Sequence, residues 1–376
     1  MKILKIASLI IGVSPALALA EIIVGVTLST TGPAASLGVP ERNTIALLGE
    51  TLGGEPVRYI ILDDASDPTT AAKNAQRLIT ENNADVLIGS TTFPGARSVA
   101  AVAAQHKIPQ IALAPDLPPA TETPWTFSVP QTAATMTAGV VEHMAKNGIK
   151  TVGYVGFADS LGDSFYSALV PLAKEKGIEI VATEKYARGD RSALAQVTKI
   201  IAANPDAIFI GASGTPAALP MLNMAERNYS VQVYTTPGAV GDDFLRVGGK
   251  AVEGTIAPTG LISVADQLPD TNPSKEMGTT LAKLYNAQHG SGGQSPFAGY
   301  AYDSYLLLNE AVPKALEAGK PGTAAFRSAL RDALENTQDV VGTHGIYNYS
   351  ATEHNSVDPR SRALVQVKDG EWKVVE

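Results

Sequence analysis

Residues 17–41 read LALAEIIVGVTLSTTGPAASLGVPE, an apolar run that passes into an alternating β-branched stretch and then into a loop of small residues. Residues 22–28 are typical of a buried strand, because they are mostly apolar and rich in β-branched side chains. The Thr, Gly, Pro, Ala and Ser residues that follow suit the carboxyl end of a parallel strand, where ligands bind in open α/β sheets. The stretch therefore predicts an α/β fold whose first strand ends at a binding site.

The first twenty residues have the composition of a secretory signal peptide. Lys2 and Lys5 precede an apolar run, residues 6–19, that is too short to span a bilayer, and residues 18–20 form a small-x-small cleavage pattern. We expect cleavage after Ala20 and export of the remaining chain. The sequence contains no Cys, so we expect neither a lipid anchor at the cleavage site nor a disulfide.

The charge of the exported chain excludes two classes of partner. Without Lys2 and Lys5 it carries 27 basic and 37 acidic residues, a net charge of about −10 with His neutral. Nucleic acids and anionic membranes are bound by neutralising their phosphates with Lys and Arg. We therefore expect neither as a partner.

Strand-like and helix-like segments alternate from residue 22 onward, in two units separated by a proline-rich segment at residues 115–127. Apolar strands separated by helices predict parallel sheets covered on both faces. We expect strands at 22–28, 57–62, 86–88, 108–113, 151–155, 178–181, 207–210, 231–235, 340–343 and 362–367. We expect helices at 41–50, after an Asp67 N-cap, and at 95–106, 132–147, 164–176, 192–203, 274–289, 299–318 and 323–335.

Five of the expected strands end in loops of small and hydroxyl-bearing residues: 29–36, 89–96, 156–164, 211–216 and 235–241. Glycine allows close backbone approach, while Ser and Thr supply hydroxyls and cap the next helix. One such loop is an ordinary strand-to-helix turn. Five of them, drawn from both units, predict a shared ligand site in a cleft.

These segments resemble those of a known family. VGVTLSTTGPAASLG, LDDASDPTTAAKNAQRLI, ADVLIGSTTFPGARSVA, IPQIALAP, GFADSLGDSF and YAYDSYLLLNEA are similar, in this order, to the periplasmic leucine/isoleucine/valine-binding proteins of ABC transporters. The resemblance implies a type I periplasmic-binding-protein fold, with two doubly wound α/β lobes joined by three hinge crossings. It implies a division into residues 21–126 plus 259–336 for lobe 1 and 127–258 plus 337–376 for lobe 2, with 1–20 as the signal peptide.

The resemblance also implies a function and its site. The implied protein is a monomeric periplasmic receptor that needs no cofactor or metal, encloses a small carboxylate ligand between its lobes and delivers it to a membrane permease. A receptor that feeds a chemoreceptor or histidine kinase is the alternative, and a secreted α/β hydrolase is a more distant one. Carried over position by position, the ligand-binding residues are Leu37, Thr91, Thr92, Phe93, Pro94, Gly95, Ala114, Asp116, Phe157, Asp159, Leu161, Ser213, Gly214, Pro237 and Gly238.

One departure from the family pattern bears on the ligand. Amino-acid receptors of this family usually carry an acidic residue after the fourth strand of the second lobe, whereas here residues 236–239 read TPGA and the first acid is Asp242. An unpaired buried ammonium would cost several kcal/mol. An apolar or aromatic carboxylate therefore fits at least as well as an amino acid, unless Asp116 or Asp159 pairs with the ammonium.

No set of residues in the sequence indicates catalysis, so we expect the protein not to be an enzyme. Asp63 and Asp64 are adjacent in a strand and would point to opposite faces, which indicates loop hydrogen bonding rather than joint action on one atom. The five His residues show no metal-ligand spacing. We interpret Trp125 as a packing residue near the first hinge.

Overall fold

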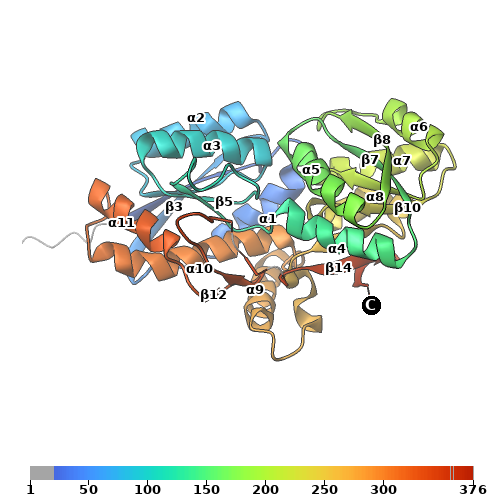
Figure 1. The fold of residues 1–376 in the computed structure, drawn as a ribbon. Helices are drawn as coiled ribbons and strands as arrows, with labels where there is room; N and C mark the ends of the chain where they lie inside the picture. Colours follow the sequence, from blue (N-terminus) through green and yellow to red (C-terminus); the bar gives the residue numbers. More distant parts are fainter. Residues whose placement is uncertain (1–20, 356, 359, 376) are drawn as a thin grey trace, which may run out of the picture.

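The computed structural model describes residues 21–355, 357–358 and 360–375, which fold into two α/β lobes (Figure 1). The predicted signal peptide lies outside the described residues. None of the helices in the described ranges is both long enough and apolar enough to cross a membrane.

The first lobe is built on a six-stranded sheet. Its strands are β1 (Ile22–Leu28), β2 (Thr51–Leu52), β3 (Glu55–Asp63), β4 (Val86–Gly89), β5 (Gln110–Ala112) and β6 (Thr126–Ser128). They lie in the order β2-β3-β1-β4-β5-β6, and every neighbouring pair is parallel except β2 and β3. The first strand of the chain therefore lies inside the sheet, between β3 and β4.

Helices cover both faces of this sheet, because successive residues of β1 point to opposite sides. Val24 and Val26 pack in one core with residues of α1 (Ala35–Ile45), α10 (Pro296–Leu316) and α11 (Ala324–Glu335). Ile23 packs in a second core with residues of α2 (Pro68–Thr80) and α3 (Phe93–His106). The loops after the strands are thereby fixed at one edge of the lobe.

The second lobe is built on a seven-stranded sheet. Its strands are β7 (Thr151–Phe157), β8 (Glu179–Tyr186), β9 (Ala207–Gly211), β10 (Gln232–Thr235), β11 (Ile256–Thr259), β14 (Ala363–Lys368) and β15 (Glu371–Val374). They lie in the order β15-β14-β11-β10-β9-β7-β8. The strands from β11 to β8 in this order are parallel to their neighbours, whereas β14 pairs antiparallel with β11 and with β15 at one edge of the sheet.

Helices also surround the second sheet. They are α4 (Ala133–Lys146), α5 (Ser160–Glu175), α6 (Leu194–Ala202), α7 (Leu219–Glu226) and α8 (Asp242–Gly248), with 3₁₀ turns η1 (Thr215–Ala218), η2 (Pro237–Ala239) and η3 (Gly249–Val252). Met136, Val140 and Met144 of α4 are buried in its core, as their spacing predicts. A turn η4 (Leu261–Gln267), helix α9 (Ser274–His289) and a small ladder of β12 (Val340–Val341) and β13 (Ile346–Tyr347) complete the structure.

The chain passes between the lobes three times, after β6, after β11 and between α11 and β14. Hydrogen bonds between buried polar groups connect the segments at these crossings. Asp303 of α10 accepts hydrogen bonds from the backbone N–H groups of Thr343 and His344 and from the Tyr347 hydroxyl. Gln131 Nε2 donates to the Ser361 carbonyl at 2.7 Å, which joins the first crossing to the third.

Most predicted elements are confirmed with shifted ends. Thr132 caps α4 by accepting the Thr135 N–H, and α9 has the predicted bounds. The predicted start of α1 at residue 41 is wrong, because the helix begins at Ala35 and passes through Pro40. α5 begins at Ser160 instead of residue 164, since Asp159 caps it. Sequence patterns did not predict β6, β11 or β15, which are only three or four residues long.

Candidate functional site

A cavity lies between the two lobes, and we call it the inner cavity. Lobe 1 contributes residues of α1, of the connections after β4, β5 and β6, and of α10. Lobe 2 contributes residues of α5 and of the loops after β8, β9 and β10. In both sheets the site therefore lies at the carboxyl ends of parallel strands, where open α/β sheets bind their ligands.

The wall of the inner cavity is mostly apolar. The aromatic side chains of Phe93, Phe165, Phe297 and Tyr300 line it together with leucines and prolines. Among the described residues that line it, none is an Asp or a Glu, and Arg188 is the one charged group. The wall therefore favours a ligand with a large apolar surface and a single negative charge.

Arg188 is held in place on three sides. Its Nε donates to Asp159 Oδ2 at 2.5 Å, its Nη1 donates to Ser213 Oγ at 3.1 Å, and its guanidinium lies 4.3 Å from the centroid of the Phe157 ring. The Arg188 side chain is only 14% exposed. Its Nη2 is buried and has no hydrogen-bond partner among the described residues. A buried donor without a partner is costly, so Nη2 is poised to donate to an anionic ligand.

Two hydroxyls supply further donors. Thr92 Oγ1 accepts the Gly95 N–H at 3.2 Å and caps α3, which leaves the hydroxyl hydrogen of Thr92 for another acceptor. Ser213 Oγ accepts from Arg188 in the same way. Both residues line the inner cavity, one from each lobe. A carboxylate between them would therefore be bound by both lobes at once.

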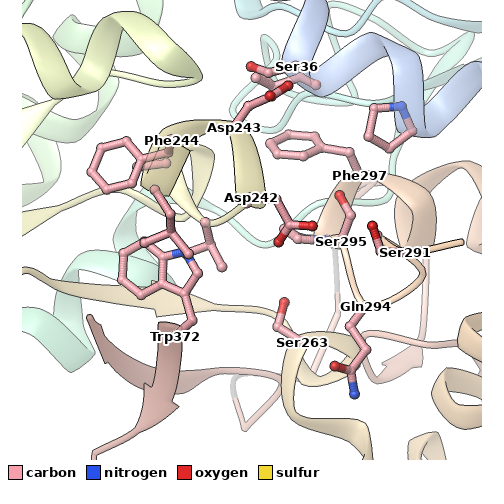
Figure 2. A pocket seen from close by; sticks show the side chains of 18 of the residues that line it. Ser36, Asp242, Asp243, Phe244, Ser263, Ser291, Gln294, Ser295, Phe297 and Trp372 are labelled. Carbon is pink, nitrogen blue, oxygen red and sulfur yellow. The ribbon is translucent and has the colours of Figure 1, made fainter. Parts of the chain in front are cut away.

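A second, larger cavity of about 770 Å³ adjoins the inner cavity, and we call it the outer cavity (Figure 2). It shares Leu37, Gly238 and Phe297 with the inner cavity, so these three residues lie where the two meet. Figure 2 shows the polar side chains of Asp242, Ser263 and Gln294 in its wall. In the part of the chain that the structure describes, no Lys or Arg lines the outer cavity. An anionic group is therefore better placed in the inner cavity, beside Arg188.

The structure brings eight of the sequence-predicted residues into the wall of the inner cavity. They are Leu37, Thr91, Thr92, Phe93, Leu161, Ser213, Pro237 and Gly238. Gly214 lines the outer cavity instead. Pro94 and Gly95 lie in the first turn of α3 behind the wall, and the Ala114 carbonyl accepts a hydrogen bond from the Ser128 hydroxyl.

The remaining predicted residues support the site from outside its wall. Phe157 lies beneath the guanidinium of Arg188, and Asp159 pairs with Arg188 while it caps α5. Asp116 Oδ2 accepts the Ala133 N–H at 3.0 Å, and burial raises the pKa of Asp116 to about 6. Neither Asp116 nor Asp159 lines the inner cavity, so neither is placed to pair with a ligand ammonium there.

Nine lining residues are absent from the ligand-binding residues named from the sequence: Leu113, Pro115, Pro130, Gln131, Phe165, Arg188, Thr236, Phe297 and Tyr300. Of these, Leu113 and Pro115 lie in the loop 112–116 that the resemblance assigns to the site. Arg188 could have been found from the sequence. The strand before it was predicted to end at residue 181, but β8 continues to Tyr186, so the segment 187–191 is a further loop at the carboxyl end of a parallel strand. With the strand bounds correct, Arg188 is the one basic residue at such a position among the described residues of the wall.

The paired carboxylates Asp63 and Asp64 are used for loop hydrogen bonding, as predicted. Asp63 accepts from the backbone N–H groups of Thr30 and Thr31, and Asp64 accepts from the hydroxyls of Ser29 and Ser90. In the part of the chain that the structure describes, no group of three or more His, Asp or Glu residues could hold a metal ion. Trp125 lies outside both cavities, with Arg331 above its ring.

The sequence and the fold were compared with those of known proteins. The family described as periplasmic binding protein matches residues 21–371. An extracellular ligand-binding receptor from Rhodopseudomonas palustris HaA2 is 43% identical, with a TM-score of 0.92 over 95% of this chain and 100% of that one. This agreement covers both lobes.

Two further similar proteins are described by what they bind. An amino acid binding protein from Pseudomonas aeruginosa PAO1 is 25% identical over 245 residues, and the match spans 62% of this chain and 64% of that protein. A solute-binding protein of an ABC transporter from R. palustris, solved with benzoate, is 22% identical with a TM-score of 0.80, over 94% of this chain and 95% of that one. At this identity the second likeness concerns the fold alone.

Proposed function

Because this chain belongs to the periplasmic binding protein family, of the leucine/isoleucine/valine-binding type, we propose that it is a receptor for a small aromatic or apolar carboxylate. The observation that carries this proposal is the buried Nη2 of Arg188, which has no partner among the described residues and belongs to a largely apolar cavity without a carboxylate in its wall. A carboxylate would pair with this group, whereas an ammonium would find no acid there.

The proposed mechanism is closure of the lobes around the ligand. Arg188 and Ser213 belong to lobe 2, and Thr92 belongs to lobe 1, so one carboxylate can contact both only when the lobes are together. Such contacts favour the closed state by their own free energy. We propose that the closed monomer delivers its ligand in the periplasm to the permease of an ABC importer, with the lobe division and the signal peptide that the sequence predicts.

The test is a binding screen on residues 21–376. Its probes are benzoate, phenylacetate and hexanoate, neutral benzamide, and the amino acids leucine and phenylalanine. We expect the carboxylates to raise the midpoint of thermal unfolding, because a ligand at 100 times its Kd stabilises by about 2.7 kcal/mol. Benzamide should bind measurably but much more weakly than benzoate, and the amino acids should have little effect. Stabilisation by leucine with no response to the simple carboxylates would overturn the proposal.

A further inference from the structure

Glu41 of α1 is a fully buried acid directly behind the wall of the inner cavity. Its Oε2 is 2.5 Å from Thr91 Oγ1, and Thr91 lines that cavity. Its Oε1 is buried and has no hydrogen-bond partner in the described structure. An ionised carboxylate in such a place loses its hydration without full compensation, whereas the neutral acid loses much less. Burial accordingly raises the pKa of Glu41 well above its usual value.

The proton of Glu41 decides which way the Thr91 hydroxyl can donate. Thr91 Oγ1 already accepts the Ser29 N–H at 3.0 Å. When Glu41 is ionised, the Thr91 hydroxyl must donate to Glu41 Oε2 and has no hydrogen to offer the cavity. When Glu41 is protonated, it donates to Thr91 Oγ1, which still has a second lone pair for the Ser29 N–H. The Thr91 hydrogen is then free to turn toward a ligand.

The other titratable and charged groups around Glu41 do not neutralise its carboxylate. Asp64, which follows β3, adds a negative charge on the same side and raises the pKa of Glu41 further. Tyr300 of α10 donates its hydroxyl to Gln131 Oε1 at 3.2 Å. Arg42, next to Glu41 in α1, is exposed and donates to Asn43. Arg188 lies in the opposite wall of the cavity, in lobe 2, where it is paired with Asp159.

We propose that this receptor takes up a proton at Glu41 when it binds its anionic ligand, and so binds that ligand more tightly as the pH falls. This inference rests on the proposed function. An anion in the inner cavity is repelled by an ionised Glu41 across the low-dielectric wall, and it gains the Thr91 hydrogen bond only when Glu41 is neutral. Both effects favour the protonated acid in the occupied state, so binding and proton uptake are linked.

The test is calorimetric titration of the wild-type chain, residues 21–376, with benzoate at about pH 5.5, 7 and 8.5. Each pH is measured in two buffers of different ionisation enthalpy, which gives the number of protons taken up. We expect proton uptake at one or more of these pH values and a Kd that rises with pH, by up to about tenfold per unit. Glu41→Gln keeps a neutral donor beside Thr91, so it should bind benzoate with less proton uptake than the wild type and with a flat Kd.

Glu50→Gln is the matched control, because Glu50 is exposed in the same lobe and its removal should leave the proton uptake unchanged. Glu41→Met replaces Glu41→Gln if the amide variant is unstable, since burying an apolar side chain in place of a charge is often tolerated. Benzoate binding by the wild type without proton uptake, or equal uptake by the Glu41 variants, overturns this inference and leaves the proposed function standing. No benzoate binding at any pH counts against the proposed function itself, and this inference falls with it.

Discussion

Gly214 of lobe 2 faces Leu37 of lobe 1 so closely that a Cβ atom on Gly214 would lie 2.9 Å from Leu37 Cδ1. The same Cβ atom would lie 3.0 Å from Ser36 Oγ, and Gly214 has a φ of +64°. Only glycine adopts this backbone conformation freely and leaves room for the opposite lobe. The contact between the lobes therefore depends on the missing side chain.

We expect Gly214→Ala to weaken ligand binding by about tenfold or more, because the methyl group opposes closure. The backbone of Gly214, with a φ of +64° and a ψ of −161°, is open essentially to glycine alone, so the variant also loses stability. Gly177→Ala is the control for adding a methyl group at a glycine of positive φ, since Gly177 has a φ of +67° in the same lobe but open space around its Cβ position. Calorimetric titration with benzoate measures both. Equal affinities for the two variants would show that the contact of Gly214 with Leu37 does not limit closure.

The second prediction concerns Arg188. Truncating one partner of a buried, hydrogen-bonded charge pair costs about 2–5 kcal/mol, so we expect Arg188→Gln to lose about 30-fold or more in benzoate affinity. Arg188→Lys should recover only part of this loss, because an ammonium cannot reproduce the three-sided guanidinium contacts.

The readout is the ratio of benzoate to benzamide affinity, which cancels any general loss of stability from the unpaired Asp159. Arg191→Gln, in the same loop but exposed, should leave that ratio unchanged. If Arg188→Gln and the wild type have the same ratio, Arg188 does not bind the carboxylate.

The two lobes could be predicted from the sequence because alternating apolar strands and helices are local patterns. Val86–Gly89 and Ala207–Gly211 are continuous apolar runs, and Thr132 marks the start of α4 by its own side chain. The short strand β6 has no such pattern, because it follows Pro124 and Trp125 and pairs with β5 only through the tertiary structure.

Only part of the site could be predicted, because only some of its residues follow from local sequence patterns. Residues that follow strands, such as Thr92 and Ser213, could be found from the strand ends. Phe165, Phe297 and Tyr300 lie inside helices, where an aromatic residue reads as an ordinary core residue. Which helical aromatic residues face the cleft depends on how the lobes meet, and the spacing of residues along the sequence does not indicate this.

The third prediction concerns the pH dependence of stability at the lobe crossings. Burial raises the pKa of Asp303 to about 6, from 3.8. Between these values the folded chain holds a proton that the unfolded chain has lost, so the contribution of Asp303 to stability falls as the pH rises through this window and is constant above it. The change corresponds to about 2–3 kcal/mol.

Asp303→Asn removes this titration. The altered hydrogen bonds should lower the free energy of unfolding of the variant by the same amount at every pH. The difference between the free energies of unfolding of the variant and the wild type should therefore change in favour of the variant as the pH rises from about 4 to 6.5. Urea unfolding across this range measures it, with Asp332→Asn as an exposed carboxylate control in the same lobe. A parallel pH dependence in Asp303→Asn and the wild type would contradict the prediction.

The last prediction concerns two glycines at strand ends that the sequence analysis associated with ligand approach. Gly156 and Gly211 instead make room for the ring of Tyr154, whose hydroxyl donates to the Gly162 carbonyl at 2.6 Å. A Cβ atom on Gly211 would lie 1.8 Å from the Tyr154 hydroxyl oxygen. The small side chain at this strand end is therefore required by packing inside lobe 2.

We expect Gly211→Ala to destabilise the chain by about 1–3 kcal/mol or more through overpacking, with no direct effect on the ligand contacts. Adding Tyr154→Phe should recover part of this loss, because it removes the atom nearest to the new methyl group. Gly241→Ala, which has open space at its Cβ position and an extended backbone, is the control. Thermal unfolding of the wild type, of Gly211→Ala and Tyr154→Phe alone, and of the double variant measures the coupling. Additive losses in the double variant would show that Tyr154 is not what requires glycine at position 211.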